Sequence, residues 1–323
     1  MRKIGLIIPY NFKLSGIGAI LDVFELVNRI YASNKQPLPF EIILFQTPEQ
    51  LATSNNLFSG YATKPITSRL TVDIVCIPSI NIADLSTTLT KNAGYISWIQ
   101  KQYTAGAEIA SFCTGAFIFG ATGLLNGKQA TTHVDNCCAL LKEFPSIYIR
   151  PGRSVTMDDR CYTSGGSTSA YHLLILLIQK YCGDDIAIRI SKYFAIDLDR
   201  YKQSHFSIFK PDYSHSDELV KKIQKAIESE YQYINNIEDV LVDIPSSRRN
   251  IVRRFKQATG VPPIEYLQHM RIEKAKKQLE LTNRSVSEVV SDSGYTDPKS
   301  FRKVFFKLVG ITPLKYREKF KIR

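Results

Sequence analysis

Short runs of apolar, often β-branched residues alternate with helical patterns through the first half of the chain. The strand-like runs are residues 4–8, 40–45, 72–77 and 107–112, and the helical segments between them are residues 18–31, 93–103 and 115–125. Strands without polar alternation are typical of a parallel sheet that helices cover on both faces. The pattern therefore predicts an α/β domain, with a further helix, apolar nearly all round, over residues 167–181.

The last third of the chain is helical and contains few strand-like runs. Apolar residues at positions 301, 304, 305 and 308 follow the i, i+3, i+4, i+7 spacing of one buried helix face. Asp297 and Pro298 suit the start of this helix, and Gly294 can adopt the positive φ of the turn before it. The opposite face is polar and basic, with Lys299, Ser300, Arg302, Lys303 and Lys307. A short helix, a turn and a basic second helix predict a helix-turn-helix, which places one helix in a DNA major groove.

A second unit of this kind lies upstream. Ile251 and Phe255 have the spacing of a buried helix face, and the basic residues outside that face are Arg248, Arg249, Arg253 and Lys256. A long helix over residues 267–281 would join the two units. We expect the two units of one chain to enter successive major grooves on one face of the duplex, about 10 base pairs apart.

Length and charge divide the chain in the same way. A chain of 323 residues is too long for one ordinary core, so we expect two domains. Residues 1–214 hold 20 Lys and Arg against 16 Asp and Glu, whereas residues 215–323 hold 22 against 14, a net charge of +8. This asymmetry indicates a polyanionic partner for the C-terminal part. A polar stretch predicts a linker over residues 206–217, between domains at 1–205 and 218–323.

The cysteines and the apolar runs restrict the remaining possibilities. All six cysteines lie in the N-terminal part, without a C-x-x-C pair or zinc-ligand spacing, so we expect a reducing cytoplasm, no metal and no cofactor. The longest later apolar run, residues 173–178, is far shorter than the roughly 20 residues that cross a membrane. No membrane span is expected.

Residues 219–317 resemble the DNA-binding domain of the AraC/XylS transcription regulators. The resemblance rests on the turn 294–298, on the ending Gly310-Ile311-Thr312-Pro313, and on the series Ser247, Arg249, Ile251, Arg253 and Phe255, taken at every second position. It implies base-reading side chains in each unit and further DNA contacts beside them. The readers would be Arg249, Val252 and Arg253, then Lys299, Ser300 and Lys303, with Arg248 and Arg302 as the further contacts. The chain departs from the family at Leu241 and Val290, where a small residue is usual, and at Pro245 and Ser246.

The strand-like run 107–112 ends at Cys113 and passes into a helix that starts with Gly115. This is the arrangement of a nucleophile elbow, where a side chain stands at the positive end of a helix. With His133 twenty residues on, it resembles the PfpI-like branch of the class I glutamine-amidotransferase-like fold, a flavodoxin-like sandwich, over about residues 3–200. This domain followed by an AraC-type domain is the arrangement of the GlxA-type regulators.

Departures from the PfpI-like pattern leave three interpretations of Cys113 open: a ligand-pocket thiol without turnover, a plain buried cysteine, or a working hydrolase or redox-sensing thiol. Gly16 stands where that branch has an acid, Ser79 and Ile80 replace a Gly-Gly turn, and Val134 replaces a Trp. Without an acid or a clear oxyanion donor, catalysis would be poor, which favours the first interpretation. The expected ligand site consists of Gly16, Ser79, Ile80, Cys113, Thr114 and His133, with Cys113 and His133 as vestigial catalytic candidates.

The sequence thus predicts a bacterial, sequence-specific DNA-binding transcription regulator with a sensing domain that is not an enzyme. The expected partners are double-stranded DNA, an unidentified small-molecule effector, a second copy of the chain and the transcription machinery. The main alternative is a Cys-dependent amidase or hydratase with a DNA-binding tail. A weaker alternative is a nonspecific nucleoid protein.

Overall fold

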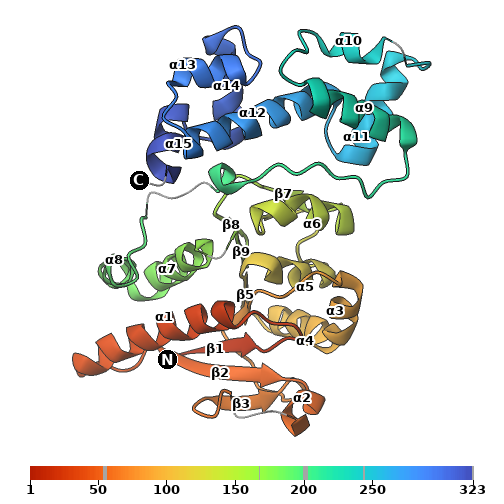
Figure 1. The fold of residues 1–323 in the computed structure, drawn as a ribbon. Coiled ribbons are helices and arrows are strands. Elements are labelled where there is room, and N and C mark those ends of the chain that lie inside the picture. The colour runs from red at the N-terminus through yellow and green to blue at the C-terminus, as the bar shows by residue number, and fades with distance from the viewer. Residues whose placement is uncertain (54–56, 167, 199–202, 243, 322–323) are drawn as a thin grey trace. The chain divides into compact units, whose positions relative to one another are not determined.

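The computed structural model describes residues 1–53, 57–166, 168–198, 203–242 and 244–321 (Figure 1). The chain divides into two compact units, Met1–Gln203 and Ser204–Arg323. Within the described residues, no helix has the length and apolar character needed to cross a membrane.

The first unit is built on a seven-stranded sheet with the order β3-β2-β1-β4-β5-β9-β8. All neighbouring strands run parallel except β8 and β9, which form an antiparallel edge. The strands are β1 (Arg2–Ile7), β2 (Phe40–Gln46), β3 (Ala62–Pro65), β4 (Ile74–Ile77), β5 (Glu108–Ser111), β8 (Val155–Asp158) and β9 (Cys161–Ser164). A separate two-stranded sheet contains β6 (Gln129–Ala130) and β7 (Tyr148–Ile149).

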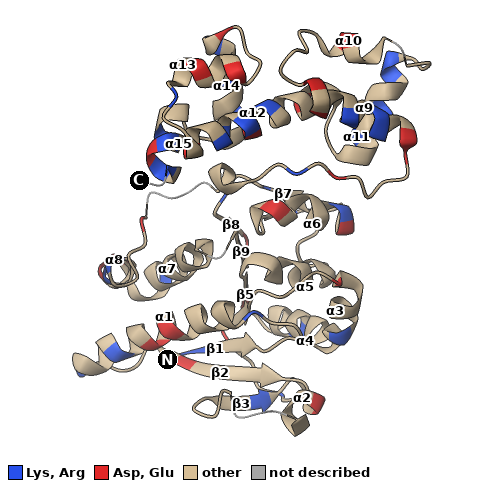
Figure 2. Ribbon diagram, in the orientation of Figure 1, with Lys and Arg blue, Asp and Glu red and all other residues tan. Residues whose placement is uncertain are grey.

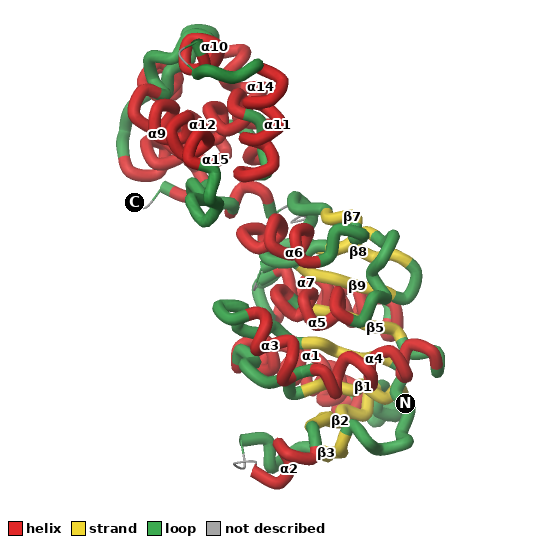
Figure 3. Tube along the Cα trace, turned by 90° about the vertical axis from the view of Figure 1, so that its right-hand side faces the viewer, coloured by secondary structure: helices red, strands yellow, loops and turns green. Residues whose placement is uncertain are grey.

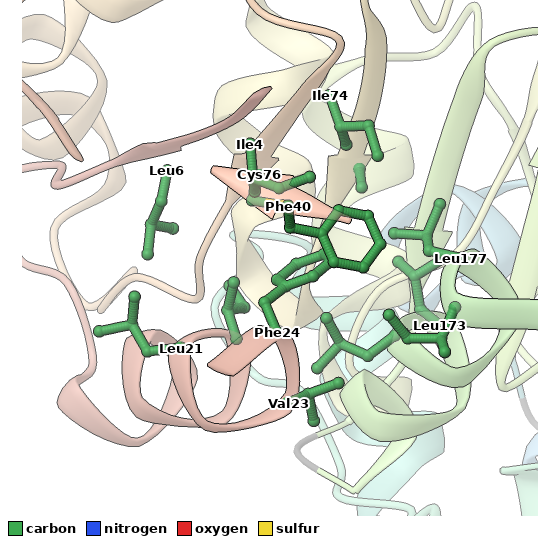
Figure 4. Close-up of a cluster of buried hydrophobic side chains, with 14 of the residues drawn as sticks. Ile4, Leu6, Leu21, Val23, Phe24, Phe40, Ile74, Cys76, Leu173 and Leu177 are labelled. Carbon is green, nitrogen blue, oxygen red and sulfur yellow. The ribbon is translucent and has the colours of Figure 1, made fainter. Parts of the chain in front are cut away.

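Helices cover both faces of this sheet, as the apolar pattern predicts (Figure 3). The helices are α1 (Leu14–Ser33), α2 (Pro48–Thr53), α3 (Leu85–Lys91), α4 (Ala93–Thr104), α5 (Ala116–Ala121), α6 (Cys137–Glu143), α7 (Ser169–Cys182) and α8 (Asp184–Tyr193). One core packs α1 and α7 on the sheet through Phe24, Phe40 and Leu173 (Figure 4). The predicted helix 167–181 corresponds to α7, and Ser167 lies outside the described residues.

The second unit is all-helical, as predicted. Its helices are α9 (Glu218–Glu230), α10 (Ile237–Leu241), α11 (Arg248–Thr259), α12 (Pro263–Leu281), α13 (Val286–Asp292), α14 (Pro298–Val309) and α15 (Pro313–Phe320). Two cores form, one around Phe255 and Tyr266 and the other around Phe305 and Tyr316. The long helix α12 contributes to both, so it joins two helix-turn-helix units, α10–α11 and α13–α14 (Figure 1).

The stretch predicted as a linker packs against the second unit. The Phe209 ring lies 5.1 Å from the Tyr266 ring, and Asp217 caps α9 while pairing with Arg254 at 2.7 Å. Aromatic packing and a charged cap outweigh the polar composition of this stretch. The domain boundaries inferred from the sequence stay a prediction, and the compact units meet between Gln203 and Ser204.

Candidate DNA interface and ligand site

The helix α11 presents its arginines to solvent. Ser247 caps its first turn by accepting a hydrogen bond from the Asn250 amide at 3.4 Å, and Gly260 ends it with a φ of 82°. The candidate residues Arg248, Arg249 and Arg253 are exposed, whereas Val252 is half-buried. Arg248 pairs with Glu238 at 2.5 Å, and Arg253 donates to the Asn250 side-chain oxygen at 2.9 Å. Asn250, which the sequence analysis did not single out, therefore orients one of the candidate readers.

The helix α14 has the same construction with different exposed chemistry. Asp297 caps it by accepting from the amides of Lys299 and Ser300 at 3.0 and 2.9 Å, and Gly310 ends it with a φ of 82°. All four candidate residues on this helix are exposed: Lys299, Ser300, Arg302 and Lys303. The blue segments of the ribbon in Figure 2 mark further Lys and Arg residues along α12 and α15. Both caps leave the basic faces open to solvent.

The two helix-turn-helix units are also tied to each other through the segment between α9 and α10, which Arg271 of α12 helps to hold. The Gln232 side chain donates to the Asp292 carbonyl at 2.8 Å, and Arg271 donates to the Tyr231 carbonyl at 2.8 Å. A Cβ at Gly294 would lie 2.7 Å from the Gln232 carbonyl oxygen, so this turn requires glycine both for space and for its φ of 81°. These contacts fix α13–α14 relative to the first helix-turn-helix unit, α10–α11.

In the first unit, Cys113 stands at a strand-to-helix turn with a φ of 54°, a conformation that non-glycine residues rarely adopt. The turn follows β5 directly and leads into α5. A Cβ at Gly115 would lie 2.5 Å from the Ile77 carbonyl oxygen, so only glycine permits the chain to pass this close to β4. The backbone geometry is that of a nucleophile elbow.

Burial raises the pKa of the Cys113 thiol above its usual value. Hydrogen bonds from Thr114, the positive charge of Lys13 and the His133 backbone oppose this shift without cancelling it. Because the thiolate is the nucleophilic form, this thiol is poorly suited to attack a substrate at neutral pH.

His133 contributes its backbone to the Cys113 turn, while its ring is engaged elsewhere. The Nδ1 atom accepts a hydrogen bond from the Asp135 amide at 3.3 Å. The other side of the ring packs on Gly166, where a Cβ would lie 3.1 Å from Cδ2. Next to His133, the Thr132 hydroxyl donates to the Cys113 carbonyl at 2.8 Å.

The remaining candidate residues close the space where an acid and an oxyanion donor would be needed. A Cβ at Gly16 would lie 2.4 Å from Ser79 Oγ, so no larger side chain fits at position 16 without displacing Ser79. The Ile80 amide donates to Thr114 Oγ1 at 3.0 Å, and the Thr114 hydroxyl donates back to the Ile80 carbonyl at 2.6 Å. The Ile80 amide is therefore already occupied.

A cavity of about 430 Å³, which was not predicted from the sequence, lies between α7, α8 and β8. Its walls are mainly apolar, with Arg153, His172 and Asp184 among the polar lining residues. None of the six candidate ligand-site residues lines it. The cavity is formed by residues that are far apart in the sequence, and no local motif marks it.

Comparison with known proteins agrees with both units. Residues 83–180 match the DJ-1/PfpI family, and residues 244–319 match a helix-turn-helix domain. The chain therefore contains one region that matches the DJ-1/PfpI family and, after it, one that matches a helix-turn-helix domain.

The similar proteins include transcriptional regulators and an enzyme. The HTH-type transcriptional regulator GbdR of Pseudomonas aeruginosa is 24% identical over 225 residues, which cover 69% of this chain and 61% of GbdR. The HTH-type transcriptional regulator GlxA of Rhizobium meliloti is 25% identical over 213 residues, 64% of each chain. Isonitrile hydratase of Pseudomonas putida is 30% identical over 118 residues, 36% of this chain and 48% of the enzyme. The matched region thus spans less than two thirds of the length of these relatives.

Proposed function

We propose that the chain is a sequence-specific DNA-binding transcription regulator whose DJ-1/PfpI domain senses a small molecule. The observation that carries the proposal is the pair of capped, basic helices α11 and α14, mounted on the shared helix α12. Paired helix-turn-helix units with exposed cations suit two adjacent major grooves. The relatives GbdR and GlxA, which are named as transcriptional regulators, support the same function.

Side-chain chemistry indicates which residues contact bases and which contact phosphates. Arginine can form two hydrogen bonds to guanine O6 and N7, whereas lysine contributes mainly a point charge. We expect base contacts from Arg249, Val252 and Arg253 in α11. In α14 we expect them from Lys299, Ser300 and Lys303, while Arg248 and Arg302 contact phosphates.

The sensing domain is proposed to bind its effector without turnover. The raised pKa of Cys113, the closed space at Gly16 and the occupied amide of Ile80 all weigh against catalysis. The effector would bind near Cys113 and His133 and favour one arrangement of the DNA-binding units, as thermodynamic linkage requires. A regulator of this kind would act on DNA in the bacterial cytoplasm as a homodimer and affect the transcription machinery.

Selection of bound fragments from randomised duplexes tests this proposal directly. The full chain should enrich a site with two half-sites about 10 base pairs apart, and addition of cell extract should change its affinity for that site. The variant Lys142→Ala, which changes an exposed lysine of α6 outside the proposed interface, serves as the control. Binding to random DNA without an enriched site would support a nonspecific nucleoid protein instead.

One observation favours a second function, a Cys-dependent amidase or hydratase. Cys113 keeps the positive φ of a nucleophile elbow, and part of the chain is similar to isonitrile hydratase. Hydration of an isonitrile and hydrolysis of amides should be assayed with the intact protein and with Cys113→Ser. Turnover that disappears in the variant would establish this function; equal, background rates would exclude it.

A further inference from the structure

Gln203 is the last residue of the first unit, and its side-chain amide is buried beside the Cys113 turn. The side chain is only 3% exposed. Its Nε2 atom lies 2.9 Å from the Thr132 carbonyl and 3.1 Å from Thr131 Oγ1, and its Oε1 atom accepts from the Gly166 amide at 3.1 Å. A buried amide with both ends bonded is costly to move, because each unmade bond leaves a desolvated polar group.

Two of these partners, Thr132 and Gly166, contact residues of the candidate ligand site. Thr132 donates its hydroxyl to the Cys113 carbonyl at 2.8 Å, and Gly166 lies against the His133 ring. A Cβ at Gly165 would lie 2.0 Å from Gln203 Oε1. The two neighbouring glycines therefore make room for two different side chains, Gly165 for Gln203 and Gly166 for His133. A molecule that displaced the His133 ring would press on the backbone that holds Gln203.

The residues directly after Gln203 are bonded to the DNA-binding unit. The Ser204 hydroxyl donates to the carbonyl of Val309, the last residue of α14, at 3.1 Å. The Ser207 carbonyl accepts from the ammonium group of Lys276, which is only 4% exposed on α12. Phe209 then stacks on His269 of α12, with ring centroids 4.7 Å apart. Six consecutive residues thus hold both the end of a recognition helix and the helix that joins the two units.

We propose that Gln203 is a positioning residue that couples occupancy of the Cys113 and His133 site to the placement of α14. The amide fixes one end of the segment 203–209 to the sensing site, and Ser204 fixes the next residue to the recognition helix. A ligand that shifts Thr132 or Gly166 changes the position of Gln203, and the covalent chain passes this change to Ser204. This coupling rests on the proposed function, since it needs a sensing site and a DNA-reading unit.

The coupling can be tested without an effector, because DNA that holds α14 in one position should in turn alter the surroundings of Cys113. The probe is iodoacetamide, and the readout is the rate of Cys113 alkylation at pH 8.5, followed by peptide mass spectrometry. Saturating the full chain with its selected operator should change this rate measurably. Gln203→Leu should still bind the operator but lose this change in rate.

A matched control separates lost coupling from lost stability. Gln102 is also a buried glutamine of the first unit, bonded through its amide to the backbone of Leu70 and Val72, 3.0 Å away in each case. Gln102→Leu should therefore disturb folding to a similar extent and keep the effect of DNA on Cys113. The proposal would be overturned if bound operator changed the Cys113 alkylation rate of Gln203→Leu as much as that of the wild type. It would also be overturned if bound operator left the wild-type rate unchanged.

A second pair of variants covers the case in which Gln203→Leu does not fold. Gly165→Ala should push the amide aside without removing it and reduce the effect of DNA on Cys113. Gly18→Ala, where an added Cβ meets nothing within 4 Å, should leave it unchanged. Equal behaviour of these two variants would count against the proposed coupling.

If selection yields no operator, the proposed function fails, and hydrogen exchange still tests the role of Gln203. Alkylation of Cys113 should then alter amide exchange across residues 204–209 in the wild type and in Gln102→Leu, but not in Gln203→Leu. Unaltered exchange in the wild type would overturn the coupling independently of DNA.

Discussion

The two helix-turn-helix units share a frame, meaning the same buried aromatic residues and helix ends, but they expose different basic side chains. The frame repeats at an offset of fifty residues, with Phe255 and Phe305 in the cores, Gly260 and Gly310 at the helix ends, and Tyr266 and Tyr316 each donating to a glutamate. On the exposed faces, Arg249 and Arg253 occupy the positions of Lys299 and Lys303. Because the buried residues and helix ends are repeated, we attribute any difference in DNA recognition to the exposed side chains. We expect the first helix-turn-helix unit, which exposes arginines, to discriminate bases more strongly than the second.

The largest expected effect tests whether the units are independent. Phe305→Ala removes a fully buried ring and should lower the free energy of unfolding by about 3–5 kcal/mol. Because the cores are separate, hydrogen exchange should rise mainly in α13–α15, whereas Phe255→Ala should affect α9–α11. Exchange that rises equally in all these helices in either variant would instead show one cooperative unit, held by the contacts of Gln232 and Arg271.

The next effect concerns base discrimination. Arg253→Ala should weaken binding to the selected operator by about 1–3 kcal/mol and relax the preference at one base pair. The control Arg253→Lys keeps the charge but loses the two-pronged geometry, so it should recover general affinity without the base preference. Affinities for all single-base variants of the operator provide the measurement. Full recovery of the preference by lysine would remove the proposed distinction between the two recognition helices.

The sequence predicts features with local causes and misses those that depend on distant residues. The apolar stripe of α14, its Asp297 cap and the turn at Gly294 involve neighbours within one or two turns, and all were predicted. The strand-to-helix turn at Cys113 was predicted in the same way. The antiparallel edge strands β8 and β9 and the cavity beside them were not, because long-range packing forms them.

Within the candidate site, residue types were easier to predict than contacts. The missing acid at Gly16 is visible in the sequence, but the filling of that space by Ser79 is not. The role of Gln203 could not be predicted, since its partners are more than thirty residues away and its surroundings give no motif. The assignment of DNA-contacting and ligand-binding residues stays a prediction.

A smaller effect concerns the loss of stability at low pH, which should differ between the two helix-turn-helix units. The hydrogen bond from Arg254 lowers the pKa of Asp217, whereas the position equivalent to Arg254 in the second unit is Val304. A carboxyl with a lowered folded-state pKa stabilises the fold above its unfolded-state pKa, about 3.9, and loses that contribution as pH falls through the folded-state pKa. Asp217→Ala should cost about 1 kcal/mol at pH 7 through the lost α9 cap.

Urea unfolding at pH 7 and at pH 3, followed by hydrogen exchange in each unit, measures this difference. Asp217→Asn retains a capping oxygen but cannot titrate, so it should reduce the acid sensitivity of α9–α11 while leaving α13–α15 unchanged. Equal acid sensitivity of α9–α11 in the wild type and in Asp217→Asn would assign the response to other groups.

The smallest expected effect concerns charge alone. Lys303 is expected to lie at a base edge but to act there mainly as a point charge, so Lys303→Ala should weaken binding to every duplex by a similar factor and reduce the salt dependence of the binding constant by about one unit of log–log slope. Lys142→Ala, remote from the proposed interface in sequence, should leave that slope unchanged. Titrations of operator and random duplex over a range of salt concentrations measure both quantities. A Lys303→Ala variant with an unchanged slope but a lost preference at one base pair would show that Lys303 selects its base as strongly as an arginine, and the two helix-turn-helix units would then be equivalent in their exposed chemistry as well as in their buried residues.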